Sequence, residues 1–238
     1  MGRLKELLKK NDDLAVYLKV KKIQVITVFT RYLSDKSFIK WQYLLRTKSS
    51  LNVEKPVTFN EKIQWYKLNY HNPMLNRCVD KIEVRDYVVQ KLGKNTANEI
   101  LIPMIGYYND VEEINFDELP QQYIVKLSNG SSFNYICENN NEINKEKIKK
   151  RFTRWLKVNY FSYGREWAYK DVKNRILIEE LLTPEKEKYP QDYRFFCFNG
   201  KVEFITVDSN SVIEGIKNTS YNRNIYTASW QQIDATIQ

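Results

Sequence analysis

The dipeptide Asn199-Gly200 constrains the fold of this chain more than any other feature of the sequence. It separates two runs rich in β-forming residues, Tyr193 to Phe198 and Lys201 to Val207. Asn and Gly both accept the positive φ angles of a two-residue type I′ turn, and this turn joins neighbouring antiparallel strands. The sequence therefore predicts a β-hairpin over these residues.

Further strand signals precede the hairpin. Gln122 to Leu127 is rich in β-formers, and the small-residue loop Ser128 to Ser132 separates it from a second run, Asn134 to Glu138. Arg175 to Glu179 is short and mostly apolar, which is typical of a buried strand. These runs predict a strand, a loop and a strand, followed later by one buried strand.

Helical signals come mostly from the first half of the chain. Thr58 and Glu61 have the spacing of a capping box, in which each side chain accepts a hydrogen bond from the backbone amide of the other residue. Further helices are predicted from Asp80 to Leu92, with Gly93 ending the helix, and from about Asn144 to Asn159. The inward face of the last helix would carry Ile148, Phe152, Trp155 and Leu156. The order of elements predicts an α+β fold with a helical N-terminal third.

The composition excludes several classes of protein. The chain has 238 residues, of which 42% are hydrophobic and 14% aromatic, so it can build a core and is not intrinsically disordered. Its longest apolar run, Ile23 to Thr30, is much shorter than the roughly 20 residues that cross a bilayer. The single histidine, His71, argues against a zinc site and against a Ser-His or Cys-His triad. The three cysteines are scattered, so we expect reduced thiols and a cytoplasmic protein.

Basic residues are concentrated near the N-terminus. Residues 1–56 contain 13 Lys or Arg and 5 Asp or Glu, within a chain whose net charge is +9. Lysines there surround an apolar stripe at roughly helical spacing, formed by Leu14, Tyr17, Leu18, Val25, Ile26 and Phe29. Such a helix either packs on its own domain with a solvated basic face or lies on anionic lipid, with residues 1–34 touching the inner face of the membrane. Nucleic acid is not expected as a partner, because the excess charge lies outside the domain that would read it.

Two short motifs suggest chemistry without establishing it. Lys126 precedes the loop Ser128 to Ser132, whose backbone amides could cradle phosphate oxygens beside the lysine charge. The same residues are also compatible with an ordinary hairpin turn and a solvated lysine. Glu179 and Glu180 end the buried strand, where acidic residues can simply mark the point at which a strand reaches the surface. Each motif alone therefore leaves both interpretations open.

The order of these motifs along the chain resembles the TupA-like ATP-grasp family of teichuronopeptide and capsular-polysaccharide biosynthesis. The matching segments are Thr58 to Trp65, Asp80-Lys81, Val84 to Val88, Leu119-Pro120 leading to Lys126, Arg165-Glu166-Trp167 with Tyr169-Lys170, Arg175-Ile176, Glu179-Glu180 and Asp192 to Gly200. The resemblance covers about residues 50–232. It implies an ATP-grasp-like fold, in which a small antiparallel-sheet lobe is followed by the start of a second lobe.

The resemblance implies an ATP site between two lobes and assigns residues to it. Lys81 and Lys126 would contact phosphates, and the loop would cover them with Ser128, Asn129, Gly130 and Ser131. Glu179 or Glu180 would accept a hydrogen bond from the adenine amino group, and backbone groups near Glu180 to Leu182 would complete the hinge. Asp192 and Arg194 would contact ribose or phosphate.

The implied reaction is the joining of a carboxylate and an amine. ATP would phosphorylate the carboxylate of a polysaccharide precursor, an amine would attack the acyl phosphate, and Mg²⁺ would stabilise the transfer. The family continues with a strand bearing a G-E-x-T-F element that holds the metal, and nothing here matches it. We therefore expect this chain to be C-terminally truncated and inactive as it stands, since Glu203 and Asp208 are not expected to replace that glutamate.

The loop also departs from the family pattern. The family has K-x-N-H-G-S-G, whereas this chain has Lys126 to Ser132 with Ser128, Asn129 and Ser132 at the varied positions, so a stiffer loop is expected.

The same pattern predicts four regions and leaves alternative functions open. The regions are a basic helical segment at 1–56, a helical entry region at 57–120, a small lobe with the phosphate loop at 121–182, and an incomplete second lobe at 183–238. One alternative is a glycosyltransferase-like or sugar-nucleotide-binding protein, although the sequence has no D-x-D motif. The other is a non-catalytic module that docks on a membrane or a partner.

Overall fold

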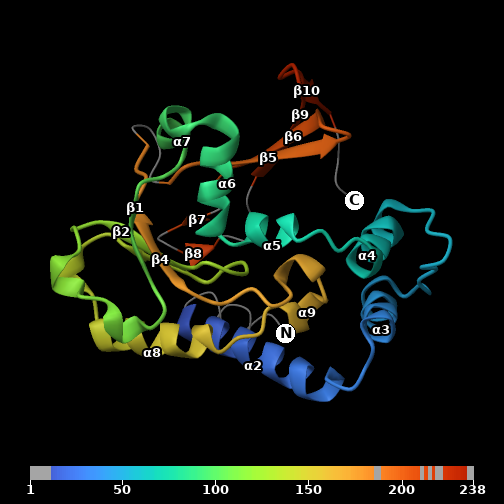
Figure 1. The fold of residues 1–238 in the computed structure, drawn as a ribbon, viewed down its shortest axis with the longest axis horizontal. Helices are drawn as coiled ribbons and strands as arrows, with labels where there is room; N and C mark the ends of the chain where they lie inside the picture. The colour runs from blue at the N-terminus through green and yellow to red at the C-terminus, as the bar shows by residue number, and fades with distance from the viewer. Residues whose placement is uncertain (1–11, 185–188, 210–211, 214–215, 218–221, 235–238) are drawn as a thin grey trace. The chain divides into compact units, whose positions relative to one another are not determined.

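The chain forms two compact units, residues 1–180 and 181–238, and each is described by itself. The structure is a computed structural model that describes residues 12–184, 189–209, 212–213, 216–217 and 222–234 (Figure 1). The described residues combine helices with antiparallel sheets, which confirms the predicted α+β class. The four predicted regions stay predictions, since this two-part division does not resolve them.

The first unit contains all the helices that the described residues form. They are α2 (Asp12–Thr30), α3 (Asp35–Thr47), α4 (Phe59–Asn69), α5 (Met74–Val79), α6 (Glu83–Leu92), α7 (Lys94–Ile100), α8 (Lys145–Leu156) and α9 (Phe161–Gly164). Short 3-10 turns are η1 (Val111–Glu113), η2 (Phe116–Glu118), η3 (Asn140–Glu142) and η4 (Trp167–Tyr169). In the described part of the chain, every helix is too short or too polar to span a lipid bilayer.

One antiparallel sheet of four strands organises the first unit. Its strands are β1 (Met104–Tyr108), β2 (Tyr123–Leu127), β3 (Asn134–Cys137) and β4 (Ile176–Glu180), in the order β1-β4-β2-β3. The last strand in sequence therefore lies inside the sheet, with Val125 of β2 opposite Ile178 of β4. The three strands predicted from the sequence are confirmed as β2, β3 and β4.

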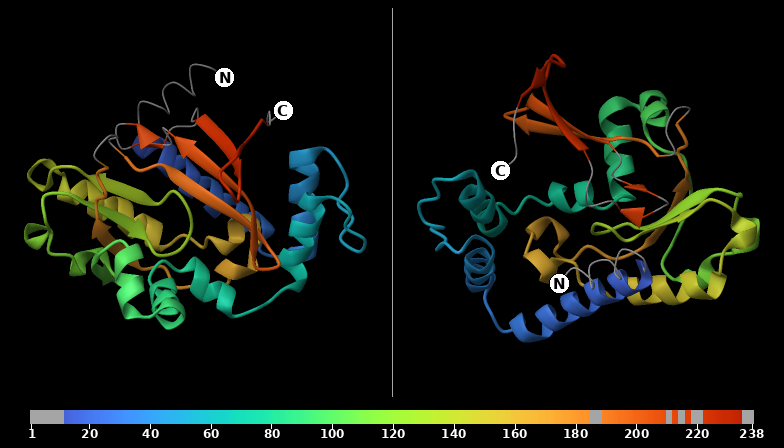
Figure 2. Two further views of the ribbon diagram at one scale, coloured as in Figure 1. Left: turned by 90° about the horizontal axis from the view of Figure 1, so that it is seen from above. Right: turned by 180° about the vertical axis from the view of Figure 1, so that it is seen from behind.

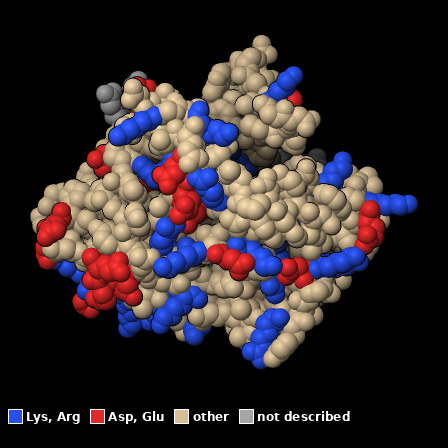
Figure 3. Space-filling view, in the orientation of Figure 1, with Lys and Arg blue, Asp and Glu red and all other residues tan. Residues whose placement is uncertain are grey.

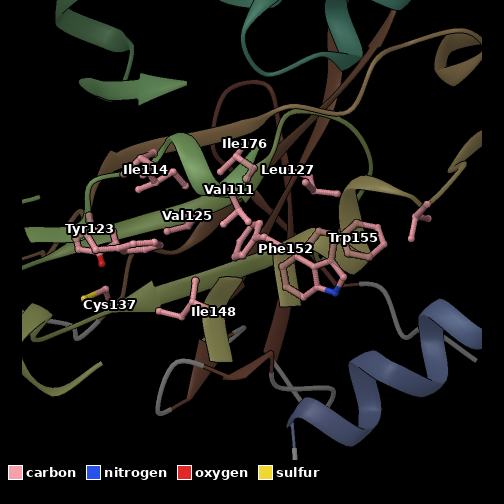
Figure 4. Packing of buried hydrophobic residues seen from close by; sticks show 14 of the residues in the cluster. Val111, Ile114, Tyr123, Val125, Leu127, Cys137, Ile148, Phe152, Trp155 and Ile176 are labelled. Carbon is pink, nitrogen blue, oxygen red and sulfur yellow. The ribbon is translucent and has the colours of Figure 1, made fainter. Parts of the chain in front are cut away.

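Alternate residues of β2 and β4 build the core on one face of this sheet. Tyr123, Val125 and Leu127 point into the same cluster as Ile176 and Ile178, because side chains two apart on a strand share a face. Helix α8 covers this face with Ile148, Phe152 and Trp155, as predicted (Figure 4). Lys126 and Glu179 occupy the alternate positions and so lie on the opposite face.

Helix α2 also packs on this core, but through a different face from the one the sequence analysis singled out. Val20 and Ile23 are buried in the core cluster, and Ile26 packs partly against a second cluster around Phe38. Tyr17, Leu18, Val25 and Phe29 are exposed, so the prediction that these residues form one stripe with Ile26 is wrong. At 100° per residue, Val20 and Ile23 lie on one side of the helix and Leu18 and Val25 on the other. The side chain of Leu14 lies outside the described residues.

The helix predicted from Asp80 begins later than expected. Helix α5 ends at Val79, and α6 begins at Glu83, because the Asp80 carboxylate accepts hydrogen bonds from the amides of Ile82 (2.8 Å) and Glu83 (3.3 Å). Asp80 therefore stabilises the turn between α5 and α6. The capping box of α4 is confirmed, with both reciprocal hydrogen bonds present.

The second unit is a separate antiparallel sheet. Its strands are β5 (Asp192–Phe198), β6 (Lys201–Ser209), β9 (Asn222–Thr227) and β10 (Gln232–Ile233), in the order β10-β9-β6-β5, beside a small ribbon of β7 (Val212–Ile213) and β8 (Ile216–Lys217). Asn199 and Gly200 have φ angles of 49° and 78° between β5 and β6. The predicted hairpin and its left-handed turn are confirmed.

Candidate functional site

The loop after β2 is fastened at its first residue. Ser128 is buried, its amide donates to the carbonyl of Arg175 (2.8 Å), and its hydroxyl accepts from the Arg175 amide (3.2 Å). Its carbonyl accepts a hydrogen bond from the Lys81 amide (2.9 Å). Ser128 therefore ties β2 to the start of β4 and to the turn between α5 and α6.

The Lys81 side chain also binds this loop, through hydrogen bonds to its backbone. Its ammonium group donates to the carbonyl oxygens of Leu127 (3.0 Å), Ser128 (3.3 Å) and Gly130 (2.9 Å). Burial, followed by the nearby positive charge of Lys126, lowers the pKa of Lys81 to about 8. The structure thus brings both predicted lysines to the base of the loop, with Lys81 bound to the loop's own carbonyl groups.

Gly130 is required by the shape of the loop. Its φ of +83° is one that side chains with a Cβ rarely adopt, and an added Cβ would lie 2.8 Å from the Tyr160 ring. The Tyr160 phenol also accepts a hydrogen bond from the Ser131 amide, and burial raises its pKa to about 12. The loop therefore rests on an aromatic side chain that sequence reasoning missed.

The two ends of the loop differ in exposure. Asn129 is buried and its amide nitrogen donates to the Val172 carbonyl (3.1 Å), whereas its Oδ1 is buried with no hydrogen-bond partner among the described residues. Ser131 and Ser132 are exposed. The base of the loop is therefore fixed, and its tip faces solvent.

Glu179 links Lys126 to a second cation. Its Oε2 lies 2.6 Å from the Lys126 ammonium and its Oε1 lies 2.9 Å from Nη1 of Arg85 on α6. Glu179 is only 5% exposed, so it does not mark the point where β4 reaches the surface. Glu180 does so, since its side chain is exposed while its amide donates to the Pro103 carbonyl (3.1 Å).

A second group of charges lies where β4 begins. Nη2 of Arg175 contacts the carboxylates of Asp80 (2.8 Å) and Glu83 (2.7 Å), and Asp80 is buried. These three residues line a cavity of about 560 Å³. The other lining residues are Asn76, Arg77, Trp167, Lys170, Asp171, Val172 and Lys173. The turn that carries Lys81 is therefore held in place by ion pairs to Arg175, the residue that precedes β4.

The remaining predicted site residues are Leu182, Asp192 and Arg194, and they belong to the second unit. Leu182 and Asp192 are exposed. Arg194 is paired with the buried carboxylate of Asp208 (2.7 Å), which also binds Nε and Nη2 of Arg223 (2.5 and 2.7 Å). The roles proposed for Leu182, Asp192 and Arg194 toward a nucleotide stay predictions.

The described carboxylates do not form a cluster large enough to hold a metal ion. Among the described residues, no group of three or more His, Cys, Asp and Glu side chains lies close enough together to bind one. Glu179 and Asp208 are both engaged by two basic side chains. The residues present therefore identify no ligand set for Mg²⁺.

Arg85 and Tyr160 are among the site residues that sequence reasoning missed. Arg85 lies in the segment Val84 to Val88, one of those that carry the family resemblance, and this was a usable signal. Tyr160 had no local signal, because only the tertiary structure brings it beneath Gly130.

Comparison with known sequences places these features in a family. The sequence model described as "TupA-like ATPgrasp" matches residues 61–238. This match covers most of the chain, including both lysines, the loop and β4. No curated protein and no solved structure matches the chain.

Proposed function

The chain belongs to the TupA-like ATP-grasp family, and from this we propose that it binds ATP with the triphosphate held by Lys81, Lys126 and the loop at 128–132. The observation that carries the proposal is the convergence of the two lysines at the base of a loop whose tip is exposed. A fixed loop and two ammonium groups suit a phosphate chain, because they supply donors and positive charge without reorganisation.

Lys126 is the lysine best suited to touch phosphate. Its hydrogen-bond partner among the described residues is Glu179, and an ammonium group has three donor hydrogens. Lys126 can therefore keep its ion pair and still donate to an oxygen of the ligand. Lys81 would act mainly through its charge and by holding the carbonyl groups of the loop.

Of the two glutamates that could accept from adenine, the geometry favours Glu180. Both oxygens of Glu179 contact cations, which suits this residue to positioning Lys126. Glu180 follows it with an exposed carboxylate at the end of β4. We assign Glu179 to the phosphate side of the site and Glu180 to the adenine side.

The reaction that the family suggests is ATP-dependent ligation of a carboxylate and an amine in cell-surface polysaccharide biosynthesis. The part of Lys126 and Lys81 would be to hold the transferred phosphoryl group and neutralise its charge as the carboxylate attacks it. Mg²⁺ bound with ATP would supply further charge neutralisation. Since the described residues identify no ligand set for it, no residue is assigned to the metal.

Titration calorimetry with ATP and Mg²⁺ tests this proposal. The Lys126→Met variant should bind at least about tenfold more weakly than the unmodified chain, because a hydrogen bond to a charged group contributes roughly 1.5–3 kcal/mol. Lys150→Met is the matched control, since Lys150 is an exposed lysine on α8, the helix that covers the other face of the sheet. It should leave the affinity unchanged.

Two results would contradict the proposal. Equal affinity of the Lys126→Met variant and the unmodified chain, with both folded by circular dichroism, would remove Lys126 from the site. Binding of UDP-glucose but not ATP would instead favour the sugar-nucleotide alternative.

A further inference from the structure

Helix α2 carries large apolar side chains on the face that points away from the core. Phe29 is 78% exposed, and Leu18, Val25 and Val28 are also exposed. They lie opposite Val20 and Ile23, which anchor the helix in the core, and the row continues past the helix to Tyr32, which is 83% exposed. A helix that only covers a core carries polar residues on this face, so this one has the pattern of a docking surface.

The charged residues on this face are all basic. Lys21 and Lys22 are exposed among the apolar residues, and Arg31 follows at the end of the helix. The sequence contains no Asp or Glu between Asp13 and Asp35. An apolar helix face with only positive charges is complementary to a lipid surface that has apolar acyl chains beneath negatively charged head groups.

Helix α8 adds basic residues next to α2. Lys150 and Arg154 line a cavity of about 200 Å³ together with Tyr17 of α2, and the Arg154 guanidinium lies 5.8 Å from the centre of the Tyr17 ring. Figure 1 and the right-hand view of Figure 2 show α2 and α8 along the same lower edge. Figure 3 shows Lys and Arg side chains along that edge, with a group of Asp and Glu side chains at its left end.

From this arrangement we propose that the outward face of α2 docks on an anionic lipid membrane. Leu18, Val25, Val28 and Phe29 enter the boundary between head groups and acyl chains. Lys21 and Lys22 extend to the lipid phosphates, as long basic side chains do at interfaces. Docking of this kind holds the protein on the surface without crossing the bilayer, and it is independent of the proposed nucleotide site.

Vesicle co-sedimentation of the full chain tests the proposal. The chain should pellet with vesicles of phosphatidylcholine and phosphatidylglycerol, and much less with phosphatidylcholine alone. Binding should weaken as salt is raised, because charges at the surface are screened over about 10 Å at 0.1 M. The Lys21→Gln/Lys22→Gln variant should bind about thirtyfold more weakly, since each basic residue near an anionic surface contributes about fivefold.

A variant that removes an apolar side chain distinguishes insertion into the lipid from electrostatic attraction to the head groups. Phe29→Ser should weaken binding by about tenfold or more, from the loss of one buried aromatic side chain. Leu92→Ser and Lys62→Gln are the matched controls, because both residues are exposed on other helices. Both controls should bind vesicles like the unmodified chain, and all variants should keep its melting temperature because the substituted residues are exposed.

Three outcomes would overturn the proposal. They are no pelleting of the unmodified chain with anionic vesicles, equal pelleting with neutral and anionic vesicles, and unchanged binding by a folded Phe29→Ser variant. The last result would mean that lipid binding comes from charge alone and that this apolar face does not insert into the membrane.

Discussion

Each unit of the chain buries one carboxylate between two basic side chains, but the two arrangements differ in what they join. In the first unit, Glu179 of β4 binds Lys126 from β2 and Arg85 from α6, so it connects a strand and a helix. In the second unit, Asp208 binds Arg194 and Arg223 from the two strands on either side of β6. The first arrangement positions residues of the candidate site, and the second joins neighbouring strands of one sheet.

The two arrangements also differ in their basic residues, which are a lysine and an arginine in the first unit and two arginines in the second. Arg223 meets Asp208 through two nitrogens, Nε and Nη2, in the forked geometry that suits guanidinium and carboxylate. The first unit has a lysine in the corresponding role, and a lysine keeps donors that can turn toward a ligand. Lys126 can therefore keep its ion pair with Glu179 and still donate a hydrogen bond to a ligand.

The largest effect is expected from Glu179→Gln. This change leaves Arg85 and Lys126 without a counter-charge, and both side chains are less than a fifth exposed. Removing one partner of a buried ion pair costs about 3–5 kcal/mol of unfolding free energy. Urea unfolding measures the loss, and Glu180→Gln, an exposed neighbour on the same strand, should change stability by less than about 0.5 kcal/mol. Equal midpoints for the two variants would show that Glu179 has no special part in the fold.

Asp208→Asn should have a smaller effect, although Asp208 is the more deeply buried carboxylate. The Arg194 side chain is 44% exposed, so water screens its charge when the partner is removed. We expect a loss of roughly 1.5–3 kcal/mol, the range for a hydrogen bond to a charged group. Hydrogen exchange should show it as faster exchange in β5, β6 and β9. Asp192→Asn, at the exposed position opposite Asp208, is the control, and a loss as large as that of Glu179→Gln would remove the contrast between the units.

The smallest expected effect concerns pH, because burial lowers the pKa of Lys81 in the first unit to about 8. With a Lys81 pKa of about 8, ATP should bind about tenfold more weakly at pH 9 than at pH 7, as the charge is lost. Stability should change in the opposite direction. The unfolded chain keeps the Lys81 proton up to its ordinary pKa near 10.5, so this residue's contribution to stability rises between pH 8 and 10.5.

Calorimetry and urea unfolding over this pH range measure both trends. The Lys81→Met variant is the control, because it should lose the pH dependence of both quantities. An ATP affinity that stays constant from pH 7 to 9 in the unmodified chain would exclude an electrostatic contribution from Lys81.

The elements that could be predicted from the sequence are those with local causes. The turn at Asn199-Gly200 and the capping box at Thr58 depend on a few adjacent residues, and both are confirmed. Helix α2 was different, because it has apolar residues on two faces and only the tertiary structure determines which face the core covers. Val20 and Ile23 were therefore overlooked in favour of Leu18, Val25 and Phe29.

The residues of the candidate site also divide into those with a local sequence signal and those that only the tertiary structure brings together. Lys126 and its loop form a local pattern, but this pattern alone leaves an ordinary hairpin turn open, and the family resemblance is what predicts their place in the site. The contacts of Lys81 with three carbonyl groups, the ion pair of Glu179 with Arg85, and the support of Gly130 by Tyr160 all join residues more than 25 positions apart. Pairings at that separation have no counterpart in the spacing of a single sequence.

The sheet order β1-β4-β2-β3 has a consequence for how the chain folds during its synthesis. β2 and β3 can pair as soon as they leave the ribosome, but β1 has β4 as its neighbour in the sheet. β4 is made last and must insert between β1 and β2, so both strands present open edges until translation passes Glu180. Because long-range strand pairing is slow, nascent chains that stop before β4 should be the species most prone to aggregate and to bind chaperones.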